Sequence, residues 1–156
     1  MTTPAARKQL EALAEEIFGL TNLSYRMRAR AQRGSNVETL TETEYLTLDM
    51  LSREDSLTVG EIQKGVGVLP AQMSRIVRSL EDKGGTAYIA CNINPDDRRK
   101  IDVSLTTEGR KSLASFRAAR MASIIDTLSV LNTEERDEFV RLLRKIQKKF
   151  TQSLQG

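Results

Sequence analysis

The sequence predicts a mainly α-helical fold with one small β-hairpin, and three observations support this prediction. Apolar residues recur at three- and four-residue spacing through most of the 156 residues, which is the pattern of amphipathic helices. Between residues 86 and 105 the pattern changes to that of short strands. A turn-forming run, Asn-Pro-Asp-Asp at residues 94–97, separates the two expected strands.

Length and composition limit the class of protein. A chain of 156 residues forms one domain, or one domain with helical extensions. An apolar content of 39% and a charged content of 29% suit a soluble, helix-rich protein. No window approaches 18 consecutive apolar residues, so we expect no membrane span. The N-terminus lacks the apolar core of a signal peptide, and a single cysteine suits a reducing compartment, so we expect a cytoplasmic protein.

The net charge of +3 is too small to identify a nucleic-acid partner. Its distribution is uneven: residues 1–33 carry six basic and three acidic side chains, whereas residues 34–69 carry two and seven. A DNA-binding protein needs positive charge at its contact points rather than along the whole chain. The net charge therefore neither identifies nor excludes a nucleic-acid partner.

Residues 5–33 are expected to form one long helix, because apolar side chains recur from Leu10 to Met27. The helix ends in an arginine-rich segment before Gly34. These arginines suit a solvated face and the negative end of the helix dipole, or a contact with phosphate or an acidic partner.

The next segment predicts three shorter helices. The first begins at Thr41, with Glu44 as capping-box partner, and extends to about Arg53. Thr58 caps the second, which ends near Lys64 before a glycine-rich turn. The third extends over residues 71–83, with Pro70 at its first position and Gly84 as its left-handed C-cap.

This last helix has one apolar and one polar face. Met73, Ile76, Val77 and Leu80 form the apolar face. The polar side chains are of types that bind base edges and phosphates, since glutamine pairs with adenine and arginine with guanine. An ordinary solvated helix face is the alternative. The polar residues are Gln72, Ser74, Arg75, Arg78 and Ser79.

Strands are expected at residues 86–93 and 100–105. Two helices joined by a turn and followed by a hairpin form a winged helix, whose second helix enters a DNA major groove. Two more helices follow, one capped by Thr106 or Thr107 and extending to about Val130, and one from Asn132 or Thr133 to Leu154. The terminal helices carry more apolar surface than one such lobe can bury, which predicts a homodimer.

Several chemistries are excluded. The chain contains no histidine, so it lacks His-based triads and His-liganded metal sites, and one cysteine cannot form a zinc finger. The glycines near residue 65 match neither nucleotide-binding fingerprint. Asp96 and Asp97 lie beside three basic residues, which would lower their pKa values and make them poor general acids. We therefore expect neither an enzyme nor a cofactor or metal site.

Two segments resemble a known family. They are residues 74–84 (SRIVRSLEDKG) and the signature Asp97-x-Arg99, five residues, then Leu105-Thr106. With the order of the surrounding helices, they resemble the MarR family of transcription regulators. The resemblance covers essentially all 156 residues. It implies a winged-helix lobe at residues 36–108 and dimerisation helices at residues 5–33 and 108–154.

The resemblance also implies functional residues. Members of that family are dimers that bind pseudo-palindromic operators in double-stranded DNA. Residues from Pro70 to Arg78 would form the major-groove helix, Arg99 would enter the minor groove, Asp97 would orient Arg99, and Arg98 would contact phosphate. Members often bind small aromatic effectors, for which Tyr25 and Tyr45 are candidates, with core packing as the alternative.

The sequence departs from the family pattern in the wing. The segment between Lys83 and Asp97 is longer than the pattern, and its first strand lacks basic residues. Family members that sense oxidants use an N-terminal cysteine, whereas Cys91 lies in this strand and is read as a small strand residue, with a thiol switch as the alternative. The expected function is a homodimeric repressor released by an effector. The alternative is a winged-helix protein-interaction module without DNA binding.

Overall fold

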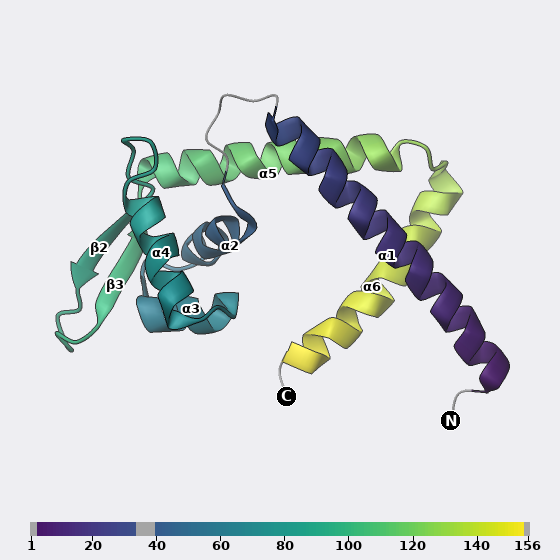
Figure 1. Ribbon diagram of the computed structural model, residues 1–156, viewed down its shortest axis with the longest axis horizontal. Coiled ribbons are helices and arrows are strands. Elements are labelled where there is room, and N and C mark those ends of the chain that lie inside the picture. The colour runs from purple at the N-terminus through teal and green to yellow at the C-terminus, as the bar shows by residue number, and fades with distance from the viewer. Residues whose placement is uncertain (1–2, 34–39, 155–156) are drawn as a thin grey trace. The chain divides into compact units, whose positions relative to one another are not determined.

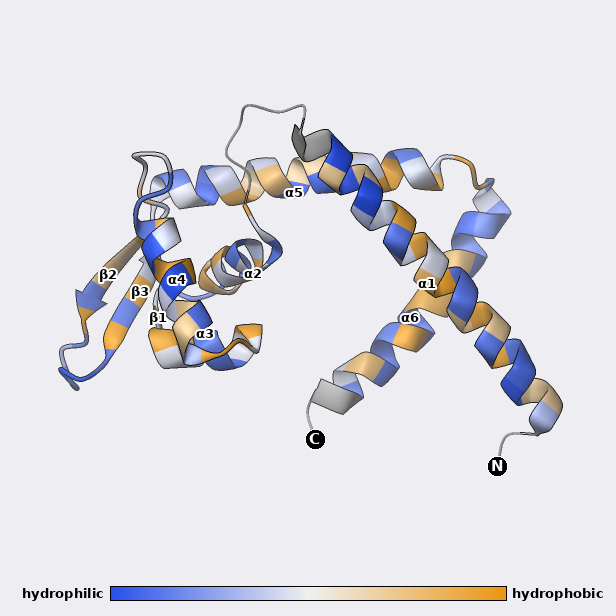
Figure 2. Cartoon of the chain, in the orientation of Figure 1, coloured by the Kyte–Doolittle hydropathy of each residue, from blue (hydrophilic) through white to orange (hydrophobic). Residues whose placement is uncertain are grey.

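The computed structural model describes residues 3–33 and 40–154, and the chain divides into two compact units, Met1–Thr41 and Glu42–Gly156. Figure 1 labels the helices and the strands β2 and β3, and Figure 2 also labels β1. In chain order they are α1 (Pro4–Arg33), α2 (Glu42–Leu51), β1 (Leu57–Thr58), α3 (Val59–Val66), α4 (Pro70–Glu81), β2 (Ile89–Ile93), β3 (Ile101–Leu105), α5 (Thr107–Leu128) and α6 (Thr133–Leu154). The predicted mainly helical fold with a small hairpin is confirmed.

The first unit is built on α1, a single helix of 30 residues, which confirms the long helix predicted at residues 5–33. Figure 2 shows hydrophobic residues recurring along it between hydrophilic ones. Its large apolar side chains are more than half exposed in the single chain. They are Leu10, Leu13, Ile17, Phe18, Leu20, Leu23 and Met27.

The hydrophobic core of the second unit lies where α2, α3 and α4 meet the sheet and the start of α5. The core side chains come from every one of these elements, and each contributes roughly 1.5–3 kcal/mol of burial free energy. Because α2 contacts α3, α4, α5 and β3, it is the central helix of this unit. The buried apolar residues are Leu48, Leu51, Ile62, Met73, Ile76, Leu80, Ile89, Val103, Leu105 and Leu113.

The sheet has three antiparallel strands in the order β1-β3-β2. Strands β2 and β3 pair over five residues, from Ile89 opposite Leu105 to Ile93 opposite Ile101. The short strand β1 pairs Leu57 with Val103, and the sequence did not predict it. The wing, which we define as the β2–β3 hairpin, therefore has β3 as a central strand rather than an edge.

The join between α4 and the wing corrects two predicted boundaries. Helix α4 ends at Glu81 rather than at residue 83, and β2 begins at Ile89 rather than at residue 86. Lys83 and Thr86 instead form a β-bridge, with reciprocal backbone hydrogen bonds of 2.9 and 3.1 Å. Gly84 and Gly85 form the two-residue turn between them, with φ of 60° and 83°. The glycine pair thus closes a tight hairpin, which favours positive φ at both central residues, instead of capping α4.

The two C-terminal helices begin as the sequence predicts. Thr106 caps α5 and accepts a hydrogen bond from the backbone N–H of Gly109 at 3.0 Å. At the start of α6, the Asn132 side chain accepts from the N–H of Glu135, whose carboxylate accepts in return from the N–H of Asn132. This reciprocal pair is a capping box. None of the helices in the described residues has the length and hydropathy of a membrane-spanning segment.

Candidate nucleic-acid interface

The turn between α3 and α4 sets the position of the α4 N-terminus. Thr58 caps α3, and the carboxylate of Glu61 accepts a hydrogen bond from the Thr58 backbone N–H at 2.7 Å. The hydrogen bonds from Thr58 lower the pKa of Glu61. Helix α3 ends at Gly67, whose φ of 74° is a left-handed C-cap. Pro70 then occupies the first turn of α4, where its missing N–H costs nothing.

Helix α4 separates its apolar and polar side chains onto two faces. Met73, Ile76 and Leu80 are buried against the lobe. Arg75 and Arg78 are exposed, and within the described residues neither guanidinium forms an ion pair. The structure thus leaves both side chains available to a partner. The other predicted residues of this face, Pro70, Gln72 and Ser74, are also exposed.

Two serines of α4 have local partners. The hydroxyl of Ser74 donates to the carbonyl of Pro70 at 3.1 Å, one helical turn back. Ser79, which the sequence placed on the polar face, is half-buried and donates to a carboxylate oxygen of Glu44 at 2.6 Å. Ser79 therefore belongs to the contact between α2 and α4, which corrects its assignment to the open face.

A buried charge cluster holds the end of α4 against α2. The Nζ of Lys83 lies 2.8 Å from each carboxylate oxygen of Glu44, and the Lys83 and Glu44 side chains are 8% and 5% exposed. Ser79 donates to the same carboxylate. The sequence assigned Glu44 only to a capping box with Thr41, which stays a prediction. A buried lysine needs a partner, but nothing in the sequence identified Lys83 as buried.

The tip of the wing presents two arginines. Arg98 is exposed, and the Arg99 side chain is 91% exposed. Asp97 accepts hydrogen bonds from the Arg99 backbone N–H and from its Nε, both at 3.1 Å. These bonds lower the pKa of Asp97, so its carboxylate stays charged at neutral pH. The structure therefore contains the ion pair that the family resemblance implied.

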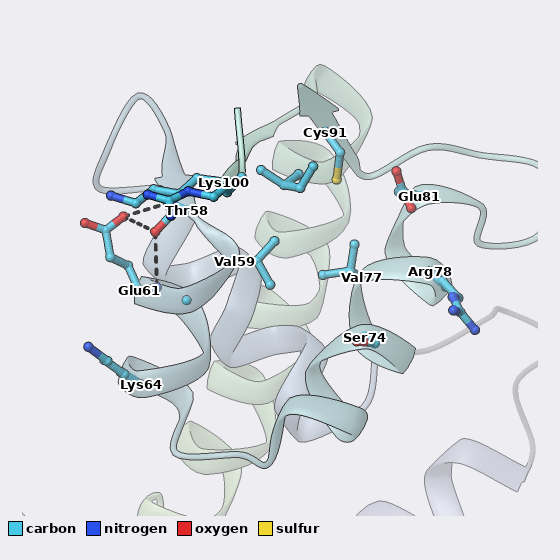
Figure 3. A pocket seen from close by; sticks show the side chains of 13 residues that line it. Thr58, Val59, Glu61, Lys64, Ser74, Val77, Arg78, Glu81, Cys91 and Lys100 are labelled. Atoms are coloured by element: carbon cyan, nitrogen blue, oxygen red, sulfur yellow. Dashed lines mark hydrogen bonds between the residues drawn. The ribbon is translucent and has the colours of Figure 1, made fainter. Parts of the chain in front are cut away.

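Helix α4 and the wing tip border one open cleft of about 830 Å³. Arg78 lines it from α4, and Arg99 lines it from the wing tip. Figure 3 shows Val59 of α3 and Val77 of α4 pointing toward one another across it. Two further cations at its edge, Lys64 and Lys100, were not predicted as site residues. Nothing in the sequence distinguishes either residue from any other single lysine on a polar surface.

Cys91 also lines this cleft, opposite Glu81 of α4. Burial is the largest cause that raises the pKa of the thiol to about 11. A hydrogen bond that the thiol donates to the Glu81 carboxylate, and the negative charge of that carboxylate, raise it further. A thiol with this pKa is almost entirely protonated at neutral pH, whereas reactive cysteines have lowered pKa values. This environment favours the structural interpretation of Cys91 over a thiol switch.

The two tyrosines proposed for an effector have different surroundings. Tyr45 of α2 is half-buried and stacks on Phe116 of α5, with ring centroids 5.0 Å apart. Arg120 lies over the ring of Phe116, with its guanidinium carbon 5.6 Å from the ring centroid. Tyr25 lies on α1 and is exposed. The structure tests neither tyrosine as a ligand contact. Within the described residues, no three acidic or cysteine side chains converge as a metal site.

Comparisons with known proteins agree with this architecture. The model of the MarR family matches residues 40–101. An HTH-type transcriptional repressor of Mycobacterium tuberculosis is 31% identical over 107 residues, which cover 69% of this chain and 75% of the relative. FabT of Streptococcus pneumoniae, solved in complex with DNA, is 21% identical with a TM-score of 0.73, covering 93% of this chain and 99% of FabT.

A third similar protein is BpsR of Bordetella bronchiseptica, whose DNA binding is regulated by 6-hydroxynicotinic acid. It is 24% identical to this chain with a TM-score of 0.59, covering 85% of this chain and 98% of BpsR. At these identities, the FabT and BpsR likenesses establish a shared fold.

Proposed function

The chain belongs to the MarR family, and from that premise we propose that it is a homodimeric repressor that binds a pseudo-palindromic operator in double-stranded DNA. MarR proteins are transcription regulators and not enzymes. Helix α4 enters the major groove, and the wing tip contacts the neighbouring minor groove. A small aromatic effector releases the DNA.

The observation that carries this proposal is the cleft shared by α4 and the wing. Arg78 and Arg99, which are 21 positions apart in the sequence, line the same opening. One DNA duplex can therefore meet both side chains at once. Arginine binds the edge of guanine in the major groove, and it also inserts into a narrow, electronegative minor groove. FabT shows that a protein of this fold can bind DNA.

The proposed roles divide between base and phosphate contacts. We assign base-edge contacts to Gln72, Arg75 and Arg78. Contacts with the DNA backbone are assigned to Pro70 and Ser74, which lie toward the N-terminal end of the same helix. Arg99 contacts the minor groove, oriented by Asp97, while Arg98 contacts phosphate. Phosphate contacts position a protein on the duplex, whereas base contacts confer specificity. The two groups should thus respond differently to a change of DNA sequence.

The proposed dimer uses the helices outside the winged-helix lobe. Apolar side chains on α1, and separately on α5 and α6, are exposed in the single chain, and exposed apolar surface of this kind usually marks an interface. Pairing of two copies would place two α4 helices about 34–36 Å apart, the spacing of successive turns of DNA. The exposed residues of α5 and α6 are Met121, Ile124, Ile125, Phe139, Leu142, Leu143, Ile146 and Phe150.

We propose that an effector releases the DNA by changing the distance between the two α4 helices of the dimer. A ligand that binds one arrangement of the two lobes better than another shifts the protein toward that arrangement. A small change in the distance between the two α4 helices prevents both from fitting one operator. Tyr25 and Tyr45 are the candidate contacts, because an aromatic ligand stacks on tyrosine. BpsR provides an example of such regulation in a protein of this fold.

Selection from random duplex DNA tests the proposal. The wild-type protein should recover sequences with two inverted half-sites centred about 10 base pairs apart, or a multiple of that distance. Recovery of unrelated sequences, or of none, would contradict a sequence-specific operator.

One observation favours a second function. Strand β2 (Ile89–Ile93) carries no charged residue, and Ile93 at its end is 65% exposed. A wing with this surface suits a protein-interaction module that has lost DNA binding. Salt distinguishes the two functions, since a DNA-binding protein loses affinity steeply as salt rises, whereas the interaction module would bind no duplex at any salt.

A further inference from the structure

We propose that Asn94 and Asp102 are positioning residues for DNA recognition: they fix the backbone of the wing tip so that Asp97 holds Arg99 ready for the minor groove. This inference rests on the proposed function and adds two residues to its machinery. Neither residue belongs to the Asp-x-Arg signature. The wing tip is defined here as residues 94–100, between β2 and β3.

Asn94 joins the base of the tip to its backbone. Its side-chain nitrogen donates to both carboxylate oxygens of Asp102, each at 2.9 Å. Its side-chain oxygen accepts from the backbone N–H groups of Asp96 and Asp97, at 3.0 and 2.8 Å. One half-buried amide thus holds two parts of the hairpin together.

Asp102 is a fixed anchor for this amide. It lies on β3, the central strand, where it is paired with Asn92 of β2 on one side and with Thr58 of β1 on the other. The Asp102 carboxylate is therefore held by a strand with neighbours on both edges. The unpredicted strand β1 gains a role here, because it prevents β3 from being a mobile edge.

The series of contacts continues from Asn94 to Arg99. The N–H of Asp97 is fixed by Asn94, and the Asp97 carboxylate accepts from both the N–H and the Nε of Arg99. The backbone closes the same tip, since the Asn94 N–H donates to the Lys100 carbonyl at 3.0 Å. Arg99 is thus held by a series of polar contacts that starts on the central strand.

Ordering Arg99 before it binds has an energetic consequence. A long, exposed side chain loses rotamer freedom when it enters a groove, and a preorganised side chain loses less. The Arg99 side chain is 91% exposed, so no packing holds it in place, and its hydrogen bonds to Asp97 must do so. Without Asn94, the wing tip and Arg99 should be less ordered in the free protein. Arg99 would then lose more conformational entropy on binding, and the affinity for DNA should fall.

The first experiment compares Asn94→Ala with Asn92→Ala, which removes an exposed asparagine from the same hairpin. The probe is a duplex selected from a random pool by the wild-type protein, and the readout is fluorescence anisotropy. Asn94→Ala should weaken binding about twofold to thirteenfold, the range for one rotamer-rich side chain. Asn92→Ala should bind as the wild type does.

Combination with Arg99→Ala separates positioning from a general structural effect. If Asn94 acts through Arg99, the double variant should bind no more weakly than Arg99→Ala alone. Effects that multiply would show that Asn94 acts independently of Arg99 and would overturn the proposal. So would wild-type affinity in Asn94→Ala.

A reciprocal exchange tests the same contact even if Asn94→Ala unfolds the hairpin. Asn94→Asp places its new carboxylate beside that of Asp102 and should weaken binding. Adding Asp102→Asn restores a donor–acceptor pair and the wild-type net charge, and it should restore affinity. No recovery would overturn this inference alone. Failure of the wild type to select any duplex would overturn the proposed function and, with it, this inference.

Discussion

The ammonium of Lys83 lies 2.8 Å from both carboxylate oxygens of Glu44, and both side chains are buried. This pair connects α2 to the residues that follow α4. A buried ion pair contributes little net stability compared with apolar residues of the same volume, but loss of one partner leaves an uncompensated charge. The pair therefore fixes the end of α4 relative to α2 more than it stabilises the lobe.

The first prediction concerns this pair. Lys83→Met should lower the free energy of unfolding by about 3–5 kcal/mol, measured by urea denaturation. Lys64→Met is the control, since Lys64 is exposed on α3, and its effect should stay within about 0.5 kcal/mol. The double variant Glu44→Leu/Lys83→Met should recover most of the loss. Equal effects of Lys83→Met and Lys64→Met would contradict a structural role for the pair.

Gly109 provides a second stability test. An added Cβ at this position would lie 2.0 Å from the backbone carbonyl oxygen of Tyr88, which cannot move as a side chain can. Gly109→Ala should therefore destabilise the protein by about 2 kcal/mol or more. A Cβ at Gly60 of α3 meets no atom within 4 Å, so Gly60→Ala should be neutral or stabilising by up to about 1 kcal/mol. The unfolding temperature should fall in Gly109→Ala but not in Gly60→Ala, and a similar fall in both would refute the close contact.

Features that depend on residues close together in the chain were predicted from the sequence, whereas contacts between distant residues were not. The Thr58 cap, Pro70 at the start of α4 and the start of α6 depend on neighbours within four residues. The first two were predicted, and the start of α6 was predicted at Asn132 or Thr133. The β1 strand is two residues long and exists through its pairing with β3, more than 40 residues away. The Glu44–Lys83 pair joins residues 39 positions apart. No local pattern encodes such contacts.

The candidate site shows the same division. Residue type and position on the helix predicted Arg75 and Arg78, the family resemblance implied Arg99, and the structure leaves all three exposed. The sequence did not predict the role of Asn94, because asparagine in a turn is so common that its hydrogen bonds to Asp102 have no signature. Ser79 was assigned to the polar face by helical periodicity alone. Periodicity identifies the direction of a side chain, but not which helix will pack against it.

The pKa of Asp97 gives a third prediction. Arg99 lowers this pKa in the folded protein below its ordinary value of 3.8. The stabilisation from the pair is thus present above pH 3.8 and is lost as the pH falls through the lower, folded-state pKa. A carbon-detected NMR titration of the Asp97 carboxyl should show its pKa rising in Arg99→Ala. An unchanged pKa in that variant would mean that the ion pair is absent in solution.

Cys91 gives a fourth prediction. Its thiol pKa of about 11 compares with an ordinary 9.0, so the native protein should hold roughly one hundredth of the thiolate of an unfolded chain at neutral pH. Alkylation by iodoacetamide at pH 7.5 should be slower by a similar factor in the native state than in urea. Glu81→Gln should speed the native reaction, because it removes a nearby negative charge. Equal native and denatured rates would contradict a raised pKa, and a faster native rate would favour the thiol-switch alternative.

The central claim is that α4 and the wing tip contact one DNA duplex together. The most direct measurement is anisotropy of the selected duplex over a range of salt concentrations, with the wild type, Arg75→Ala and Arg99→Ala. The account predicts a steep fall of wild-type affinity with salt and a loss of about 1–3 kcal/mol in each variant, while both variants unfold at the wild-type temperature. Wild-type affinity in both variants, or no duplex binding at any salt, would contradict it.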